Sequence, residues 1–218
     1  MKTCKAPDPD TRKPGIELPP GACDSHCHIF GPGHKFPYAE GRSYTPPDAP
    51  VEIFRKMQNV LGFERAVIVQ AGCHGTDNAA MLDAIAEGGG AFRGVVLIRP
   101  EVSDKELGRL HEAGVRGVRA ATLPQSHVGP EHMELLAARI ADMGWVMQVH
   151  LHTADHMTEL APLFRRLPTP YLIDHLGRVR GDDGIGHPGF RALLGLLAED
   201  GKCWAKLCSF YRLSDTGH

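Results

Sequence analysis

Aromatic side chains are scarce in this sequence, at 6% of its residues, and its charges almost cancel, with a formal net charge of −2. A base-stacking surface needs aromatic rings, and steering towards nucleic acid or membrane needs a surplus of one charge sign. No apolar run approaches the roughly 20 residues of a membrane-spanning helix. We therefore expect no nucleic-acid partner and no membrane partner.

The six cysteines include no C-x-x-C pair, which argues against a zinc ribbon and a thioredoxin-like redox motif. The N-terminal residues are polar and rich in proline, so an apolar signal segment is lacking as well. Cysteine use of this kind is typical of reduced thiols. We predict a cytoplasmic protein.

What the sequence does contain is an alternation of short apolar runs and longer amphipathic segments. Residues 1–20 are polar and predict an extended lead-in, and residues 21–218 predict one partial barrel domain. The apolar runs, which we interpret as strands, are 22–30, 66–71, 94–99, 117–121, 146–151, 171–175 and 204–209. The amphipathic segments, which we interpret as helices, are 51–61, 77–87, 104–113, 131–143, 157–167 and 190–199.

Strands that alternate with helices indicate parallel βαβ units, either in an open doubly wound sheet or in a barrel. No G-x-G-x-x-G motif follows the first predicted strand, which weakens the case for a dinucleotide-binding sheet. Polar and charged residues instead follow strand after strand, as expected at the active-site rim of a barrel. The predicted fold class is therefore α/β, a TIM-like (β/α)8 barrel that is incomplete, with about seven strands and six helices and no eighth unit.

His26 and His28 form an H-x-H pair at the end of the first predicted strand. Residues two apart on a strand project from the same face, so the two imidazoles should lie together. Such a pair could bind a metal ion or stabilise the negative charge that develops on an attacked carbonyl.

Beyond this pair, several longer stretches resemble one family, the amidohydrolase 2 group, and in particular its 2-pyrone-4,6-dicarboxylate lactonase branch. The resemblance covers about residues 16–214. It is carried by His26-Cys27-His28-Ile29-Phe30-Gly31-Pro32, Tyr44-Thr45-Pro46, Gly72-Cys73-His74-Gly75-Thr76-Asp77-Asn78, Gly117-Val118-Arg119 and Ile173-Asp174-His175-Leu176-Gly177-Arg178.

The resemblance implies a hydrolase that opens a carboxylate-bearing lactone in aromatic-compound catabolism, with a small anionic lactone as substrate and no metal or other cofactor. His26, His28 and His175 match the residues that polarise the carbonyl. The substrate-binding residues implied by the resemblance and by position are Tyr44, Arg119, His150, Arg178 and Arg212. Arginine suits this task because its planar fork donates two parallel hydrogen bonds to a carboxylate. We expect six of the side chains to converge on one cavity: His26, His28, Arg119, His175, Arg178 and Arg212.

Three positions depart from the branch. Gln125 replaces a second arginine, Gly72 replaces a serine that contacts the substrate, and His150 stands near a tyrosine. These departures favour a substrate with one anionic group fewer, or with a sulfonate.

The family's general base is an aspartate at the end of an eighth strand, and the sequence offers no residue for that position. We therefore expect an incomplete barrel of impaired activity, with unpaired strand edges that could promote self-association. Two alternatives stay open: a zinc-dependent amidohydrolase or decarboxylase that uses His26, His28 and His150, and an inactive fragment or binding module that keeps the anion-binding rim.

Overall fold

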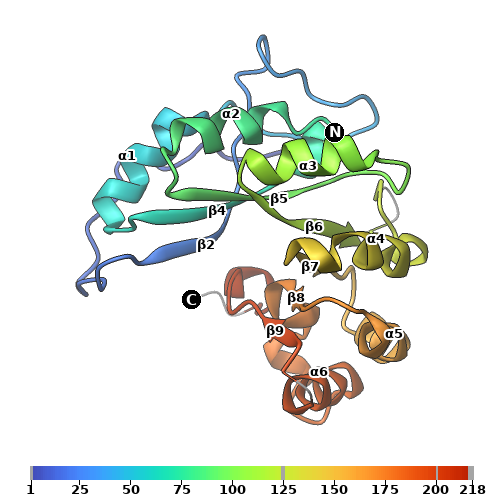
Figure 1. The fold of residues 1–218 in the computed structure, drawn as a ribbon. Coiled ribbons are helices and arrows are strands. Elements are labelled where there is room, and N and C mark those ends of the chain that lie inside the picture. Colours follow the sequence, from blue (N-terminus) through green and yellow to red (C-terminus); the bar gives the residue numbers. More distant parts are fainter. Residues whose placement is uncertain (1, 124–125, 200, 216–218) are drawn as a thin grey trace. The chain divides into compact units, whose positions relative to one another are not determined.

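The computed structural model describes residues 2–123, 126–199 and 201–215. Within these residues, seven parallel strands alternate with six α-helices, which confirms the incomplete TIM-like α/β fold class (Figure 1). The chain divides into two compact units. The first consists of Met1–Leu97 with Val102–Arg116, and the second consists of Ile98–Glu101 with Gly117–His218.

The first unit contains three parallel strands in the order β2-β4-β5, and in Figure 1 its three helices lie on one side of these strands. Its strands are β2 (Cys23–Cys27), β4 (Arg65–Val69) and β5 (Phe92–Val96), and its helices are α1 (Val51–Leu61), α2 (Ala79–Glu87) and α3 (Asp104–Glu112). Strand β2 is an edge of this three-stranded group.

The second unit contains the parallel strands β6-β7-β8-β9 in that order. Its strands are β6 (Val115–Ala121, which begins in the first unit), β7 (Val146–His150), β8 (Tyr171–Ile173) and β9 (Cys203–Ala205); its helices are α4 (Met133–Ile140), α5 (Asp155–Arg166) and α6 (Pro188–Ala198). Helices α5 and α6 pack against each other.

Local sequence signals explain several helix ends. The Ser103 hydroxyl accepts a hydrogen bond from the backbone N–H of Glu106 at 3.2 Å, which caps the start of α3. Gly62 ends α1 with φ at 86°, a left-handed conformation that glycine adopts without a steric penalty. Gly88, which follows the end of α2, instead has a right-handed conformation with φ at −66°.

Burial on both strand faces holds the sheet in place. Ile68 and Val69 are neighbours on β4, and at most 1% of either residue is exposed; on β6, Val118 is fully buried and its neighbour Arg119 is 8% exposed. Near-continuous apolar sequence is what a parallel strand needs when helices or neighbouring side chains cover both of its faces.

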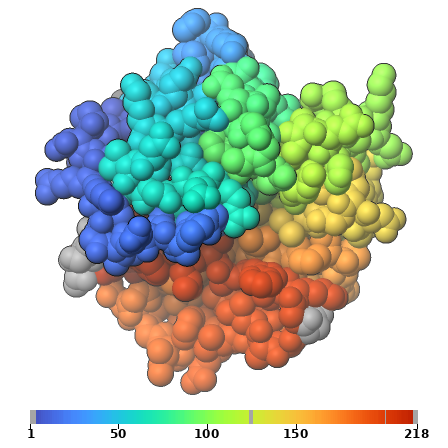
Figure 2. Space-filling view, turned by 60° about the vertical axis from the view of Figure 1, so that its left-hand side comes forward, coloured from blue at the N-terminus to red at the C-terminus, as the bar shows by residue number. Residues whose placement is uncertain are grey.

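Most of the predicted lead-in is exposed, and residues 4–10 lie on the surface of the first unit, dark blue in Figure 2. Two residues at the start of the lead-in form a strand, which the sequence pattern does not predict. This strand, β1 (Lys2–Thr3), lies parallel to β3 (Tyr44–Thr45). Among the residues described, no helix is both long enough and apolar enough to span a membrane.

Candidate functional site

A buried ion pair occupies the second unit. Arg119 projects from β6, and its Nη2 donates a hydrogen bond to Oδ2 of Asp174 at 3.3 Å. Asp174 directly follows β8 and is completely buried, and only 8% of Arg119 is exposed. Burying charges costs several kcal/mol per ion unless they are paired, so this arginine is held in one place by its partner.

The same carboxylate serves a second cation. Lys206 Nζ lies 3.8 Å from Oδ1 of Asp174, and it also donates a hydrogen bond to Oε1 of Gln148 at 2.8 Å. Gln148 in turn donates from Nε2 to Oδ2 of Asp174 at 3.0 Å. Arg119 and Lys206 therefore approach the same buried carboxylate.

His150, at the end of β7, is the second partner of Arg119. Arg119 Nη2 donates to Nδ1 of His150 at 3.0 Å, and a guanidinium can only donate, so this ring nitrogen is an acceptor. Burial lowers the pKa of His150 to about 3, and the positive charge of Arg119 contributes to the same shift. The imidazole is therefore neutral, with its proton on Nε2.

The backbone after β8 follows a left-handed path. His175, Leu176, Gly177 and Arg178 have φ values of 52°, 51°, 63° and 66°. A non-glycine residue in this region costs about 1–2 kcal/mol, and such conformations concentrate at binding and catalytic sites. The turn also explains why Asp174 and His175 are both buried: neighbouring side chains alternate between faces only along β8, which ends at Ile173.

Arg178 lies in this turn and is half-buried. Burial lowers the pKa of its guanidinium, and the like charges of Arg212 and Arg180 lower it further. Arg212 ends the 3-10 helix Phe210–Arg212, is exposed, and donates from Nε to the hydroxyl of Tyr211 at 3.1 Å. Arg178 and Arg212, which are both predicted to bind substrate, therefore lie close enough for their charges to interact.

His175 contacts two side chains of the same unit. Its ring centroid lies 5.1 Å from that of His150, with the ring planes nearly perpendicular. Its Nδ1 lies 3.1 Å from Sγ of Cys208, which follows β9. Cys208 is a residue that the sequence analysis does not connect with His175.

In the first unit, His26 and His28 lie together as strand alternation predicts. Their ring centroids are 5.1 Å apart at an interplanar angle of 85°. His28 Nδ1 lies 2.8 Å from the carbonyl oxygen of Val69, which accepts a hydrogen bond from it. A neutral His28 that donates from Nδ1 has no proton on Nε2, so Nε2 can only accept a hydrogen bond.

Tyr44, the predicted substrate-binding tyrosine, is half-buried on β3 and hydrogen-bonds the thiol of Cys73. Burial raises the pKa of that thiol to about 11, so Cys73 is a neutral, buried group rather than a nucleophile.

The Cys73–Asn78 stretch of the family resemblance builds the scaffold of the first unit. His74 accepts a hydrogen bond from the N–H of Gly31 at 3.2 Å, and its Nδ1 lies 3.2 Å from the carbonyl oxygen of Pro37. Asn78 bonds Leu97 in both directions, donating to its carbonyl oxygen at 2.9 Å and accepting from its N–H at 3.1 Å. These side chains satisfy buried backbone groups and thereby hold the loops that follow β2, β4 and β5.

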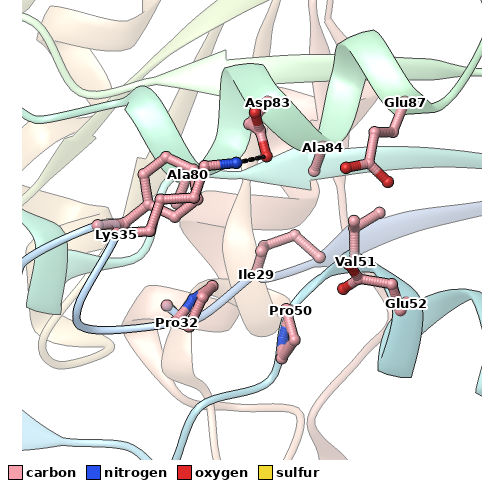
Figure 3. A pocket seen from close by; sticks show the side chains of 12 residues that line it. Ile29, Pro32, Lys35, Pro50, Val51, Glu52, Ala80, Asp83, Ala84 and Glu87 are labelled. Atoms are coloured by element: carbon pink, nitrogen blue, oxygen red, sulfur yellow. Dashed lines mark hydrogen bonds and ion pairs between the residues drawn. The ribbon is translucent and has the colours of Figure 1, made fainter.

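A separate small cavity of about 90 Å³ lies in the first unit, between the loop after β2, the start of α1 and one side of α2 (Figure 3). Its lining combines apolar residues such as Ile29 and Val51 with the ion pair between Lys35 Nζ and Asp83 Oδ2, 2.9 Å apart. None of the residues predicted for binding or catalysis lines it, so it is not the site that the sequence predicts.

Among the described residues of the second unit, a metal ion has one candidate position. His150, Asp174 and His175 offer ligand atoms that all lie within 4.8 Å of one another. Arg119 and Lys206 already approach the Asp174 carboxylate, however, and a divalent cation there would add to two positive charges. The donor set therefore fits a metal ion poorly as long as both cations stay in place.

The structure groups Arg119, His150 and His175 in the second unit, with Arg178 and Arg212 close to each other in the same unit. It groups His26 with His28 in the first unit. Gln125 lies outside the described residues. The convergence of the predicted site residues on a single cavity, and the role of each residue, stay predictions. Gln148 and Lys206 contact Asp174 but are not among the residues predicted from the sequence. The only sequence signal for them is a polar residue inside or just after an apolar strand.

Comparison with known proteins places these observations in a family. The family model described as amidohydrolase matches residues 23–217. The chain is 43% identical over 208 residues to a 2-pyrone-4,6-dicarboxylate hydrolase of Comamonas testosteroni, covering 94% of this chain and 68% of that protein. It is 37% identical over 201 residues to a 4-sulfomuconolactone hydrolase of Hydrogenophaga intermedia, covering 90% of this chain and 65% of that one.

A crystal structure of a probable 2-pyrone-4,6-dicarboxylic acid hydrolase from Acinetobacter baumannii, with citric acid bound, has the same fold. The TM-score is 0.77 at 28% identity, over 90% of this chain and 73% of that one. This chain thus spans about two thirds of the length of the curated relatives it matches. On the extent of the family match and on the identity to these hydrolases, the chain belongs to the amidohydrolase family.

Proposed function

We propose that this protein is a hydrolase that opens a carboxylate-bearing lactone of the 2-pyrone-4,6-dicarboxylate type. The observation that carries the proposal is the buried Arg119. It is oriented by Asp174 at 3.3 Å and by neutral His150 at 3.0 Å, and the side chain of Lys206 approaches the same carboxylate. A dicarboxylate substrate has the charge and the geometry that an arginine side chain binds.

The relatives support this substrate class. Two of them are hydrolases of a pyrone dicarboxylate and of a sulfonated muconolactone, both small anionic lactones. The Acinetobacter relative holds citric acid, which carries three carboxylic groups. An arginine that is already desolvated binds a carboxylate more strongly than an arginine in water, because the low local dielectric strengthens the charge-assisted hydrogen bond.

In the proposed reaction, Tyr44, Arg119, Arg178 and Arg212 bind the carboxylates of the substrate. His26, His28 and His175 polarise the lactone carbonyl. A neutral imidazole that carries its proton on the ring nitrogen facing the carbonyl, as we propose below for His175, can donate to the oxygen as it gains negative charge. Neutral His28 donates its proton from Nδ1 to Val69, so it can donate to the carbonyl only when Nε2 is protonated as well. His150 keeps Arg119 oriented without adding a charge of its own, because its pKa is about 3.

The test compares kcat/KM for 2-pyrone-4,6-dicarboxylate between the unmodified protein and Arg119→Met. Removal of one partner of a desolvated charge pair costs roughly 2–5 kcal/mol, so a decrease of at least thirtyfold is expected. Arg166→Met is the matched control, because Arg166 is exposed and pairs with Glu134 at 2.7 Å on the surface. Unchanged kcat/KM in both Arg119→Met and Arg178→Met would eliminate the carboxylate-lactone function.

A sulfonated lactone is the second candidate substrate. Gly72 replaces the serine of the dicarboxylate lactonases, and a β-carbon at this position would meet no atom within 4 Å. The open space suits a larger anionic group, and 4-sulfomuconolactone should be assayed beside the dicarboxylate. Calorimetric titration in the same series separates an enzyme from a binding module, which would bind the lactone without opening it.

We further propose that the reaction needs no metal and takes place in a reducing, cytoplasmic environment. The six cysteines are all thiols in the structure, as a reducing compartment requires. Self-association through the edges of β2 and β9 is a separate proposal, which sedimentation over a range of protein concentrations would test.

A further inference from the structure

His175 and Cys208 come from neighbouring segments that stay connected past the ends of their strands. Strands β8 and β9 pair in parallel up to Ile173 and Ala205. Beyond that point, the N–H of Lys206 donates to the carbonyl oxygen of Ile173 at 2.9 Å, and the N–H of Leu176 donates to the carbonyl oxygen of Lys206 at 3.2 Å. These backbone bonds bring the two side chains into register.

The left-handed backbone then turns the two side chains towards each other. His175 has φ at 52°, and Ser209, directly after Cys208, has φ at 60°. The resulting distance from His175 Nδ1 to Cys208 Sγ is 3.1 Å, well within hydrogen-bonding range for sulfur. Strained residues on both sides of one contact indicate that the fold holds this geometry against a local cost.

The direction of the hydrogen bond follows from the chemistry of the two groups. Burial raises the pKa of the Cys208 thiol, against an opposing effect of the backbone N–H of His175. A protonated thiol has one hydrogen to donate, and Nδ1 is the acceptor that faces it. A neutral imidazole carries a single proton, so acceptance at Nδ1 leaves that proton on Nε2.

We propose that Cys208 is a positioning residue that holds His175 in the tautomer with the proton on Nε2, the form that donates to a lactone carbonyl oxygen. The assignment of the tautomer depends only on the contact with the thiol. Its use on a carbonyl rests on the proposed function. Cys208 itself does not touch the substrate in this proposal, and it forms no bond to it.

Nitrogen-15 NMR of the imidazole rings tests the tautomer directly, with the His175 signals assigned by their absence in His175→Gln. In the unmodified protein we expect protonated Nε2 and unprotonated Nδ1. Cys208→Ser keeps a donor and should keep this pattern. Cys208→Val keeps the volume but has no donor, and should shift His175 towards a mixture of tautomers. Protonated Nδ1 in the unmodified protein would overturn the proposal, as would a pattern unchanged by Cys208→Val.

Cys203→Val is the matched control, because Cys203 is a buried thiol at the start of β9, opposite Tyr171. It measures what the loss of a buried thiol does to this unit, and it should leave the His175 signals in place. Thermal unfolding of Cys208→Ser, Cys208→Val and Cys203→Val shows whether each variant folds. Should Cys208→Val not fold, Cys208→Ser and the unmodified protein still decide the tautomer.

Turnover is the second readout. Loss of a group that orients a catalytic side chain typically lowers activity by about 10- to 100-fold. We expect a decrease of that size in kcat for Cys208→Val, with KM nearly unchanged, and recovery in Cys208→Ser. An equal kcat in the two Cys208 variants would show that the tautomer does not matter for the reaction and would overturn the positioning role. A protein with the expected tautomer that opens neither lactone would leave the Cys208 assignment standing and would remove the proposed function instead.

Discussion

Arg119 donates a hydrogen bond from Nη2 to Nδ1 of His150 at 3.0 Å, so a residue that is always charged keeps a histidine neutral. Protonation of His150 would place two positive charges at hydrogen-bonding distance and would remove the acceptor. This is why the pKa of His150 falls to about 3, with burial as the larger cause.

The first prediction is a loss of stability in mild acid. The unfolded chain binds a proton at His150 below about pH 6.5, whereas the folded protein does so only near pH 3. Between these values the unfolded state holds more protons. The free energy of unfolding should therefore decrease as the pH falls, by at most about 1.4 kcal/mol per pH unit from this group.

Urea unfolding of the unmodified protein and of His150→Gln at pH 7 and pH 5 measures this contribution. The glutamine keeps an acceptor for Arg119 but does not titrate, so the pH dependence should become shallower. His152→Gln, an exposed histidine two residues further on, is the control and should keep the original slope. Equal slopes for the unmodified protein and His150→Gln would show that His150 does not carry the effect.

The second prediction concerns the carboxylate that two cations share. Asp174→Asn keeps the shape of the side chain but leaves Arg119 and Lys206 without their common counter-charge. Breaking a buried pair in this way costs about 3–5 kcal/mol, and we expect a loss of that size in chemical unfolding. Glu134→Gln, which removes only an exposed partner of Arg166, should change stability little. A loss no larger than that of the control would mean that the buried network is not a source of stability.

The third prediction concerns the left-handed turn between His175 and Arg178. Gly177 has φ at 63°, and a β-carbon there would lie 2.9 Å from Cγ of Met157. Gly144 has a similar conformation, with φ at 66° and ψ at 25°, but open space around it. Gly144→Ala should cost about 1–2 kcal/mol from the backbone alone.

Gly177→Ala should cost more than Gly144→Ala, because Met157 must also move, and it should lower turnover by displacing His175 and Arg178. Thermal and urea unfolding of the two variants give the difference. A Gly177→Ala protein as stable and as active as Gly144→Ala would show that the turn tolerates the extra carbon.

The fourth prediction concerns metal. Since Arg119 and Lys206 already neutralise Asp174, we expect less than stoichiometric zinc in protein purified without added metal, and turnover that a chelator does not change. Elemental analysis measures the zinc content, and a chelator titration measures the effect on turnover. Both are carried out on the unmodified protein and on Asp174→Asn. Stoichiometric zinc together with chelator-sensitive turnover would establish the zinc-dependent alternative that uses His26, His28 and His150.

Much of the fold could be predicted from local patterns. The helix predicted at 51–61 has those bounds in the structure, and every predicted strand overlaps an observed one, because burial on both faces demands near-continuous apolar sequence. The predicted helix at 131–143 is α-helical only from Met133 to Ile140, with a 3-10 turn at either end. Helix ends depend on which backbone groups find partners, and spacing alone does not report that.

The sequence by itself determined the α/β class, the family and the pairing of His26 with His28, because each of these follows from short-range periodicity or from recognisable motifs. Only the tertiary structure decided the contacts of Asp174 with Lys206 and of His175 with Cys208. Those residues lie 32 and 33 positions apart, and they meet because β8 pairs with β9 and the chain then turns left-handed at His175 and Ser209. Strand register and backbone handedness after a strand are properties of the assembled sheet, and no local pattern of residues specifies them.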